Sequence, residues 1–170
     1  MIDMQFKTTR LTIRPFNECD KDAMLEMLYD ESIKKTYMIP DFKDREAAER
    51  LFDTFVRLSN TADRYVGAIC LGDELIGFMN DTGINGGSVE MGYVISLNHQ
   101  NQGYCTEAMI GAIQYLFEGG FSEVKCGAFE ENAASIRVMQ KCGMKLLPKT
   151  DVIEYRGKKH NCIYYSIKKA

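Results

Sequence analysis

The chain has 170 residues, of which 45% are hydrophobic and 26% are charged. This is the composition of a soluble globular domain rather than of a disordered or membrane protein. The length predicts one domain, residues 1–170, with a sizeable core. Lys and Arg number 21 against 24 for Asp and Glu, and 21 − 24 gives a net charge of −3. A nucleic-acid partner is not expected, because binding a phosphate backbone needs a basic face.

Hydropathy and cysteine spacing favour a cytoplasmic protein that does not bind membranes. No run approaches the roughly 18 apolar residues of a transmembrane helix, and the first ten residues lack the apolar stretch of a signal peptide. The six cysteines lie far apart without a CxxC pair, which favours free thiols and no structural zinc or other metal. A disulfide-linked secreted protein is an alternative for an even cysteine count. We expect a monomer or a homodimer.

The first elements follow from the spacing of apolar residues. Residues 10–16 alternate Leu11 and Ile13 with polar residues and end near Pro15, a pattern typical of an edge strand. A helix is expected to begin at Asp20, because apolar residues then recur at spacings of three and four.

A second helix is expected over residues 44–58, where apolar residues again share one face. The link 37–42 before it is apolar but broken by Pro40. Such a loop either packs down or walls a pocket, and the sequence favours packing.

The rest of the chain alternates short strands with helices. Further strands are expected over 65–70, 74–79, 88–95, 124–129, 144–147, 152–155 and 162–167, and further helices over 106–117 and 133–141. The strands 65–70, 74–79 and 88–95 are separated by turn residues and predict an antiparallel meander. The whole order predicts an α/β (α+β) fold: a mixed, mostly antiparallel central sheet of about seven strands flanked by about four helices.

A polar loop at residues 96–105 precedes the helix expected at Thr106, with Gly103 just before it. The first amides of a helix lack intrahelical acceptors and lie at the positive end of the helix dipole, so a diphosphate can bind there. Gly103 would permit a close backbone approach, but a tight strand-to-helix turn explains it equally well. The loop has neither the Walker pattern nor the three glycines of a dinucleotide fingerprint.

Four segments together resemble the GNAT N-acetyltransferase superfamily, in its RimJ/RimL-like branch of ribosomal-protein N-terminal acetyltransferases. The loop segment QNQGYCTEA is similar to the Gln/Arg-x-x-Gly-x-Gly/Ala signature of the superfamily. In chain order the segments are 9–15 (TRLTIRP), 90–95 (EMGYVI), 100–108 (QNQGYCTEA) and 132–144 (NAASIRVMQKCGM). They occur in the order of the family on the expected elements, and the resemblance spans about residues 8–168.

The resemblance implies acetyl-CoA (coenzyme A) as co-substrate, with its diphosphate on the turn 102–106. It also implies a splayed cofactor cleft between the fourth and fifth strands, 88–95 and 124–129, which takes the pantetheine arm. The cofactor-binding residues that it implies are Ile95, Gln100, Asn101, Gln102, Gly103, Tyr104, Cys105, Thr106, Asn132 and Ser135.

Two positions depart from the family pattern. Cys105 stands where the family has Gly or Ala, and Leu97 replaces a common proline. A thiol beside a thioester is open to oxidation or acylation, but a small apolar filler is the more ordinary role for cysteine. Leu97 loosens the loop without removing an implied contact.

Glu90 is the implied general base, since its family counterpart often accepts the amine proton directly or through water. A solvent-facing strand residue is the alternative role for Glu90. Ser135 is the implied proton donor to the thiolate, because Met139 occupies the region where many GNAT enzymes carry a tyrosine. Ser135 also fits a helix first turn capped by Asn132, and both roles are compatible.

The acceptor is implied to be a primary amine. Deprotonating a lysine at pH 7 costs about 4.6 kcal/mol and an α-amine about 1 kcal/mol, so an α-amine demands less of the enzyme. Among the candidate acceptors a protein N-terminus leads, with a small-molecule amine such as a polyamine or an aminoglycoside close behind. Specificity candidates are Tyr37, Met38, Phe42 and the segment 155–161. A non-catalytic acyl-CoA sensor would keep the loop without needing Glu90 or Ser135, and a domain without a CoA site requires the loop resemblance to be accidental.

Overall fold

The structure is a computed structural model that describes residues 4–170. Its strands form an eight-stranded sheet in the order β1-β2-β3-β4-β5-β6-β8-β7. The strands are β1 (Phe6–Lys7), β2 (Thr12–Arg14), β3 (Val66–Leu71), β4 (Glu74–Asn85), β5 (Ser88–Ile95), β6 (Glu123–Phe129), β7 (Lys145–Tyr155) and β8 (Lys158–Lys168). The helices are η1 (Glu18–Asp20), α1 (Lys21–Tyr29), α2 (Glu31–Lys34), α3 (Arg45–Ser59), η2 (Leu97–His99), α4 (Tyr104–Glu118) and α5 (Ala133–Lys141).

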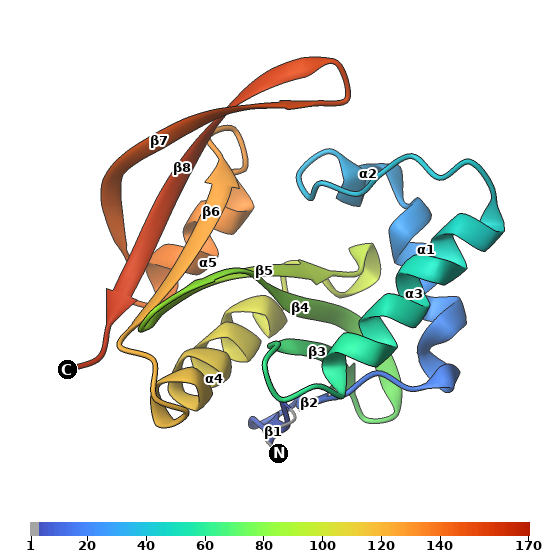
Figure 1. The fold of residues 1–170 in the computed structure, drawn as a ribbon, viewed down its shortest axis with the longest axis horizontal. Coiled ribbons are helices and arrows are strands. Elements are labelled where there is room, and N and C mark those ends of the chain that lie inside the picture. The colour runs from blue at the N-terminus through green and yellow to red at the C-terminus, as the bar shows by residue number, and fades with distance from the viewer. Residues whose placement is uncertain (1–3) are drawn as a thin grey trace. The chain divides into compact units, whose positions relative to one another are not determined.

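This architecture confirms the mixed α/β fold with a mostly antiparallel sheet (Figure 1). The ladders of β1 with β2, β2 with β3, β3 with β4, β6 with β8 and β7 with β8 are antiparallel, while β5 and β6 run parallel. The meander β3-β4-β5 is present as expected. The strand and helix counts differ slightly from the expectation because the two-residue β1 and the four-residue α2 are too short to produce a periodic pattern.

The described chain divides into two compact units. Unit 1 extends to Asn80 and includes Tyr93–Ala108, and unit 2 comprises Asp81–Gly92 and Met109–Ala170. Strands β4 and β5 and helix α4 each run from one unit into the other. One domain over residues 1–170 stays a prediction.

In unit 1, β2 is an internal strand, so the expectation of an edge strand over residues 10–16 was wrong. Ile13 pairs with Phe6 of β1 on one side and with Ile69 of β3 on the other. Pro15 lies just beyond Arg14, the last residue of β2, so its missing N–H group occupies no position in either ladder. Proline therefore marks the end of this strand rather than the edge of the sheet.

The core of unit 1 lies beneath α1 and α3, which pack side by side (Figure 1). Met24 of α1, Phe52 of α3 and Phe78 of β4 are completely buried in one apolar cluster. The link 37–42 packs against the same cluster, with Ile39 buried and Phe42 partly buried. The expectation that this apolar loop packs down is confirmed.

Unit 2 contains the ladder β6-β8-β7, in which β7 and β8 form a long hairpin (Figure 1). Its turn has left-handed φ angles of 52° at Arg156 and 74° at Gly157, as a two-residue hairpin turn requires. The strands expected separately over 144–147 and 152–155 are one strand. Its register shifts between Leu146 and Thr150, around Pro148, which has no N–H group for the ladder.

Candidate active site

The loop between β5 and α4 is braced by its own side chains. Gln100 Nε2 donates a hydrogen bond to the carbonyl oxygen of Ile95 (3.0 Å). Gln102 Nε2 donates to the carbonyl oxygen of Asn98 (3.1 Å). Both glutamines of the sequence signature therefore hold the loop backbone in this structure.

The start of the loop is also fixed. The N–H group of Ser96 donates to the carbonyl oxygen of Ile76 on β4 (2.7 Å), and the N–H group of His99 donates to the carbonyl oxygen of Ser96 (2.9 Å). The Ser96 hydroxyl and His99 Nδ1 lie 2.8 Å apart. These contacts fix η2 to the end of β5 and set the direction in which the chain approaches α4.

The turn into α4 has the geometry of an anion site. Asn101 and Gly103 have left-handed φ angles of 59° and 80°, a conformation that glycine adopts without steric cost. Helix α4 begins at Tyr104, and its first intrahelical bond runs from the Glu107 N–H group to the carbonyl oxygen of Gly103 (3.0 Å). The exposed Gly103 therefore lies at the positive end of a 15-residue helix.

Arg10 closes this turn from the N-terminal segment, a contact that sequence analysis missed. Its Nη1 donates to the carbonyl oxygen of Gln102 (3.0 Å) and its Nε to Glu107 Oε2 (2.7 Å). Its guanidinium carbon lies 4.3 Å from the centre of the Tyr104 ring. The available signal was the presence of Arg10 and Glu107 in two segments of the same family resemblance. Spacing along the chain does not pair two residues so far apart.

Glu107 is held as a carboxylate by this cluster. Partial burial raises its pKa, but hydrogen bonds from the Thr8 hydroxyl (2.7 Å) and from the main chain and side chain of Arg10 outweigh burial. The net result is a pKa below the usual glutamate value. The first turn of α4 thus carries a negative charge that Arg10 neutralises.

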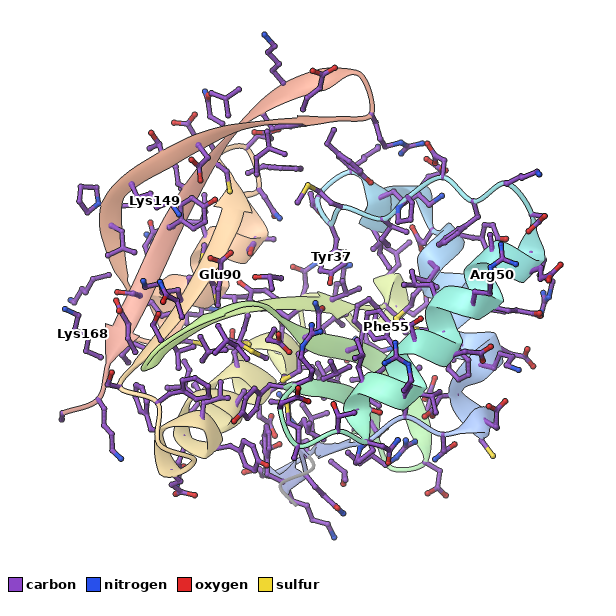
Figure 2. The ribbon with its side chains drawn as sticks, in the orientation of Figure 1. Tyr37, Arg50, Phe55, Glu90, Lys149 and Lys168 are labelled. Atoms are coloured by element: carbon purple, nitrogen blue, oxygen red, sulfur yellow. The ribbon has the colours of Figure 1, made fainter. Side chains whose placement is uncertain are left out.

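In unit 2, Glu90 lies half-buried on β5 (Figure 2). The parallel ladder of β5 and β6 runs from Ser88 with Glu123 to Glu90 with Lys125, whereas β6 continues to Phe129. Glu90 is thus the last residue of β5 in this ladder. The splayed cleft between these two strands stays a prediction.

The surroundings of Glu90 are polar. The Thr82 hydroxyl on β4 lies 3.2 Å from Glu90 Oε1 and 3.4 Å from the Glu90 carbonyl oxygen. The Cys162 thiol has a raised pKa, chiefly because it is buried, and the charge of Glu90 adds to this effect. The charge of Glu90 is thus felt at Cys162 on β8.

Helix α5 is capped as the sequence indicates. Asn132 is the N-cap, and its Oδ1 accepts a hydrogen bond from the Ser135 N–H group (3.2 Å). Ser135 is half-buried in the first turn, and Met139 is completely buried one turn later. A buried methionine offers no proton, whereas the Ser135 hydroxyl has one that it can donate.

The expected acceptor residues of unit 1 differ in exposure. The Tyr37 hydroxyl lies 2.5 Å from Asn80 Oδ1, and its ring packs edge-on to Phe78. Burial raises the pKa of Tyr37 well above that of a free tyrosine. Phe42 packs edge-on against Tyr29, while Met38 is 51% exposed. Met38 is thus the most exposed apolar side chain of this set.

The segment 155–161 holds a second polar contact in unit 2. His160 is buried, pairs through Nδ1 with Glu131, and stacks on Phe129 with 4.1 Å between ring centres. The hydrogen bond from His160 is the main cause of a Glu131 pKa below the usual value. The hairpin is thereby attached to the chain just ahead of α5.

The predicted site residues fall in both units. Unit 1 holds Tyr37, Met38, Phe42, Ile95, Gln100, Asn101, Gln102, Gly103, Tyr104, Cys105 and Thr106, and unit 2 holds Glu90, Asn132 and Ser135. Cys105 is half-buried in the first turn of α4. Within residues 4–170, no group of three or more His, Cys, Asp or Glu side chains is arranged to hold a metal ion. No helix of these described residues is long and apolar enough to cross a membrane.

Relatives in sequence are N-acetyltransferases. Residues 10–145 match the family model of the acetyltransferase (GNAT) domain. The chain is 31% identical over 148 residues to the uncharacterized N-acetyltransferase YnaD of Bacillus subtilis, which covers 84% of this chain and 83% of that protein. It is 28% identical over 141 residues to the uncharacterized N-acetyltransferase p20 of Bacillus licheniformis, covering 78% and 77%.

Solved structures share the fold. The GNAT-family acetyltransferase of Bacillus anthracis superposes with a TM-score of 0.82 at 24% identity, covering 97% of this chain and 98% of that one. The RimL ribosomal alpha-N-protein acetyltransferase, solved in complex with coenzyme A, gives a TM-score of 0.80 at 15% identity and covers 95% of each chain. With the family model matched over most of its length, the chain belongs to the GNAT family and is an acetyltransferase.

Proposed function

We propose that this acetyltransferase moves an acetyl group from acetyl-CoA to a primary amine by direct attack in a ternary complex. The observation that carries the proposal is the turn into α4, where Gly103 at φ 80° opens a long helix. A helix start of this kind binds a diphosphate through main-chain amides and its dipole. This turn also carries the residues that resemble the family signature.

In the proposed complex, the diphosphate lies on the turn formed by Gln102, Gly103, Tyr104, Cys105 and Thr106. Gln100 and Asn101 shape the loop that leads into it. The side-chain amides of Gln100 and Gln102 donate hydrogen bonds to carbonyl oxygens of the loop itself. This supports assigning the contact with the diphosphate to the main chain of the turn rather than to these two side chains.

The pantetheine arm is assigned by resemblance to Ile95 on β5 and to Asn132 and Ser135 at the start of α5. The main chain of Ile95 pairs with the arm near the thioester, and an amide there stabilises the oxyanion. The side-chain amide of Asn132 has two donors and one acceptor oxygen. Its oxygen caps α5, and a donor to the pantetheine arm is compatible with that cap.

The chemical step forms one bond and breaks another. The neutral amine nitrogen attacks the thioester carbonyl carbon, and the excess proton of the nitrogen passes to Glu90 directly or through water. Collapse of the tetrahedral intermediate breaks the carbon–sulfur bond, and the departing thiolate takes a proton from the Ser135 hydroxyl as Ser135 regains one from water. Glu90 then releases the amine proton to water, which restores both residues. The half-buried Glu90, tethered by Thr82, supports this assignment because its carboxylate is already oriented.

A protein N-terminal α-amine is the first acceptor to test, and a small-molecule amine is the second. The α-amine loses its proton about 3.5 kcal/mol more easily than a lysine, from reference pKa values near 7.8 and 10.4. Membership of the RimJ/RimL-like branch would agree with this choice. Met38, with half of its surface exposed, is the proposed apolar contact of the acceptor, beside Tyr37 and Phe42.

The test measures binding first and transfer second. Calorimetry and thermal melting with acetyl-CoA come first, since a ligand at 100 times its Kd stabilises the native state by about 2.7 kcal/mol. Acetyl transfer to a panel of N-terminal peptides, lysine peptides and polyamines follows, with thiol release as the readout. Binding with turnover on one class supports the proposal. Binding without turnover on any amine favours an acyl-CoA sensor, and no binding removes the cofactor site.

A further inference from the structure

We propose that Arg10 is a positioning residue for the cofactor, which holds the Gln102–Gly103 peptide so that its N–H group faces the diphosphate. This inference rests on the proposed function, because it presumes that the turn binds acetyl-CoA. It adds a residue from the N-terminal segment that makes no direct contact with the reacting atoms.

The argument begins with the Gln102 carbonyl. Arg10 Nη1 donates to that oxygen at 3.0 Å. In a planar trans peptide the carbonyl oxygen and the following N–H group point in opposite directions. Fixing the oxygen of Gln102 therefore fixes the N–H group of Gly103. Rotation of this peptide, which is easy beside a glycine, would break the bond to Arg10.

Arg10 itself is held at three points. Its main-chain N–H group donates to Glu107 Oε1 and its Nε donates to Glu107 Oε2, both at 2.7 Å. Its guanidinium lies on the ring of Tyr104. The Thr8 hydroxyl also donates to Glu107 Oε1 at 2.7 Å. We call Arg10, Glu107 and the Gln102 carbonyl the Arg10 clamp.

Charge gives the Arg10 clamp a second effect. Glu107 is a carboxylate in the first turn of α4, where a bound diphosphate would meet its negative charge. Arg10 pairs with this carboxylate at 2.7 Å and offsets the repulsion. A Cβ atom at Gly103 would lie 3.3 Å from Arg10 Nη2, so a larger residue there would require the guanidinium to shift by a few tenths of an ångström.

The test compares two acetyl donors on one variant. Arg10→Met keeps the apolar stem and removes all guanidinium contacts. We expect the Kd and KM for acetyl-CoA to rise on the order of tenfold, as for the loss of one charge-assisted hydrogen bond, with kcat at saturating acetyl-CoA within about threefold. S-acetylpantetheine lacks the diphosphate, and its kcat/KM should not change. Arg45→Met is the matched control, because Arg45 pairs with Glu49 on the exposed face of α3.

The outcomes separate this inference from the proposed function. Wild-type protein that fails to bind acetyl-CoA overturns the proposed function and this inference with it. Wild-type binding with an unchanged Kd in Arg10→Met, or an equal loss with both donors, overturns the inference alone. If Arg10→Met does not fold, Arg10→Lys tests the same inference. Lysine keeps the positive charge but lacks the planar guanidinium that contacts the Gln102 carbonyl and Glu107 at once. A raised Kd for acetyl-CoA with unchanged use of S-acetylpantetheine then supports the clamp, and an unchanged Kd overturns it.

Discussion

The Thr82 hydroxyl on β4 donates a hydrogen bond to the carboxylate of Glu90 on β5, with 3.2 Å between the two oxygens. Its separation from the Glu90 carbonyl oxygen is 3.4 Å, so Thr82 contacts both ends of the same residue. A glutamate side chain loses much rotamer freedom when it is held in this way. Thr82 therefore orients the proposed base before an amine arrives.

Glu90→Gln should lower kcat by about a hundredfold or more and leave the Kd for acetyl-CoA unchanged. Glutamine has a similar shape but cannot accept the amine proton, and general base catalysis contributes about 10²–10⁴ in rate. Thr82→Val is expected to lower kcat by less, because it removes only the orientation. Steady-state kinetics and calorimetry measure the two quantities. Unaltered turnover in Glu90→Gln would remove Glu90 as the base.

Gly103→Ala should weaken acetyl-CoA binding and lower the free energy of unfolding by about 1–2 kcal/mol. The stability loss comes from forcing a side chain into the left-handed region, since φ at this position is 80°. Gly72→Ala is the matched control, because φ at Gly72 is 61° and its side-chain space is open. It should lose similar stability and bind acetyl-CoA normally. Equal binding by both variants would contradict a role for Gly103 at the cofactor.

The sequence predicts best those elements whose signals are local. Helix α5 begins after Asn132 and ends before Gly143, and its expected range 133–141 matches the structure. The cap, the periodic apolar residues and the terminal glycine all lie within a dozen positions. The loop into α4 was likewise placed from a strand, a polar stretch and one glycine.

Other features depend on contacts between distant segments, which spacing does not encode. Arg10 and Glu107 are 97 positions apart, so neither residue alone indicates the clamp. The edge-strand expectation failed because β1 pairs with β2 over only two residues, too few to give a pattern. Pro15 led to the wrong expectation, because proline occurs both in edge strands and just beyond the ends of internal strands.

Asn132→Asp should separate helix capping from cofactor binding. Aspartate keeps the oxygen that accepts a hydrogen bond from the Ser135 N–H group and is a good N-cap. The melting temperature of the variant should therefore equal that of the wild type. It removes the amide donors, so the Kd for acetyl-CoA should rise by about two- to tenfold. Asn132→Ala should lose both properties, with about 1 kcal/mol less stability. Normal binding by Asn132→Asp would limit Asn132 to capping.

Glu107 should make stability depend on pH in one direction. Burial raises its pKa, but hydrogen bonds from Thr8 and Arg10 outweigh it and the folded pKa is lowered. A lowered folded pKa gives stability that is fully present above the unfolded value of about 4.3 and is lost as pH falls through the folded pKa. Glu107→Gln should therefore be less stable than wild type by about 1–2 kcal/mol at pH 7, and the difference should shrink below about pH 4.3.

Urea denaturation of both proteins from pH 7 to pH 3 measures this difference. Glu46→Gln is the control, because Glu46 is 79% exposed and pairs with Arg50 on the surface of α3. An exposed pair of this kind contributes about 0–1 kcal/mol, so its curve should follow the wild-type curve closely. A Glu107→Gln deficit that grows as the pH falls would mean that the folded pKa is raised. The carboxylate would then not be held by Arg10 and Thr8, and the charge argument for the clamp would fail with it.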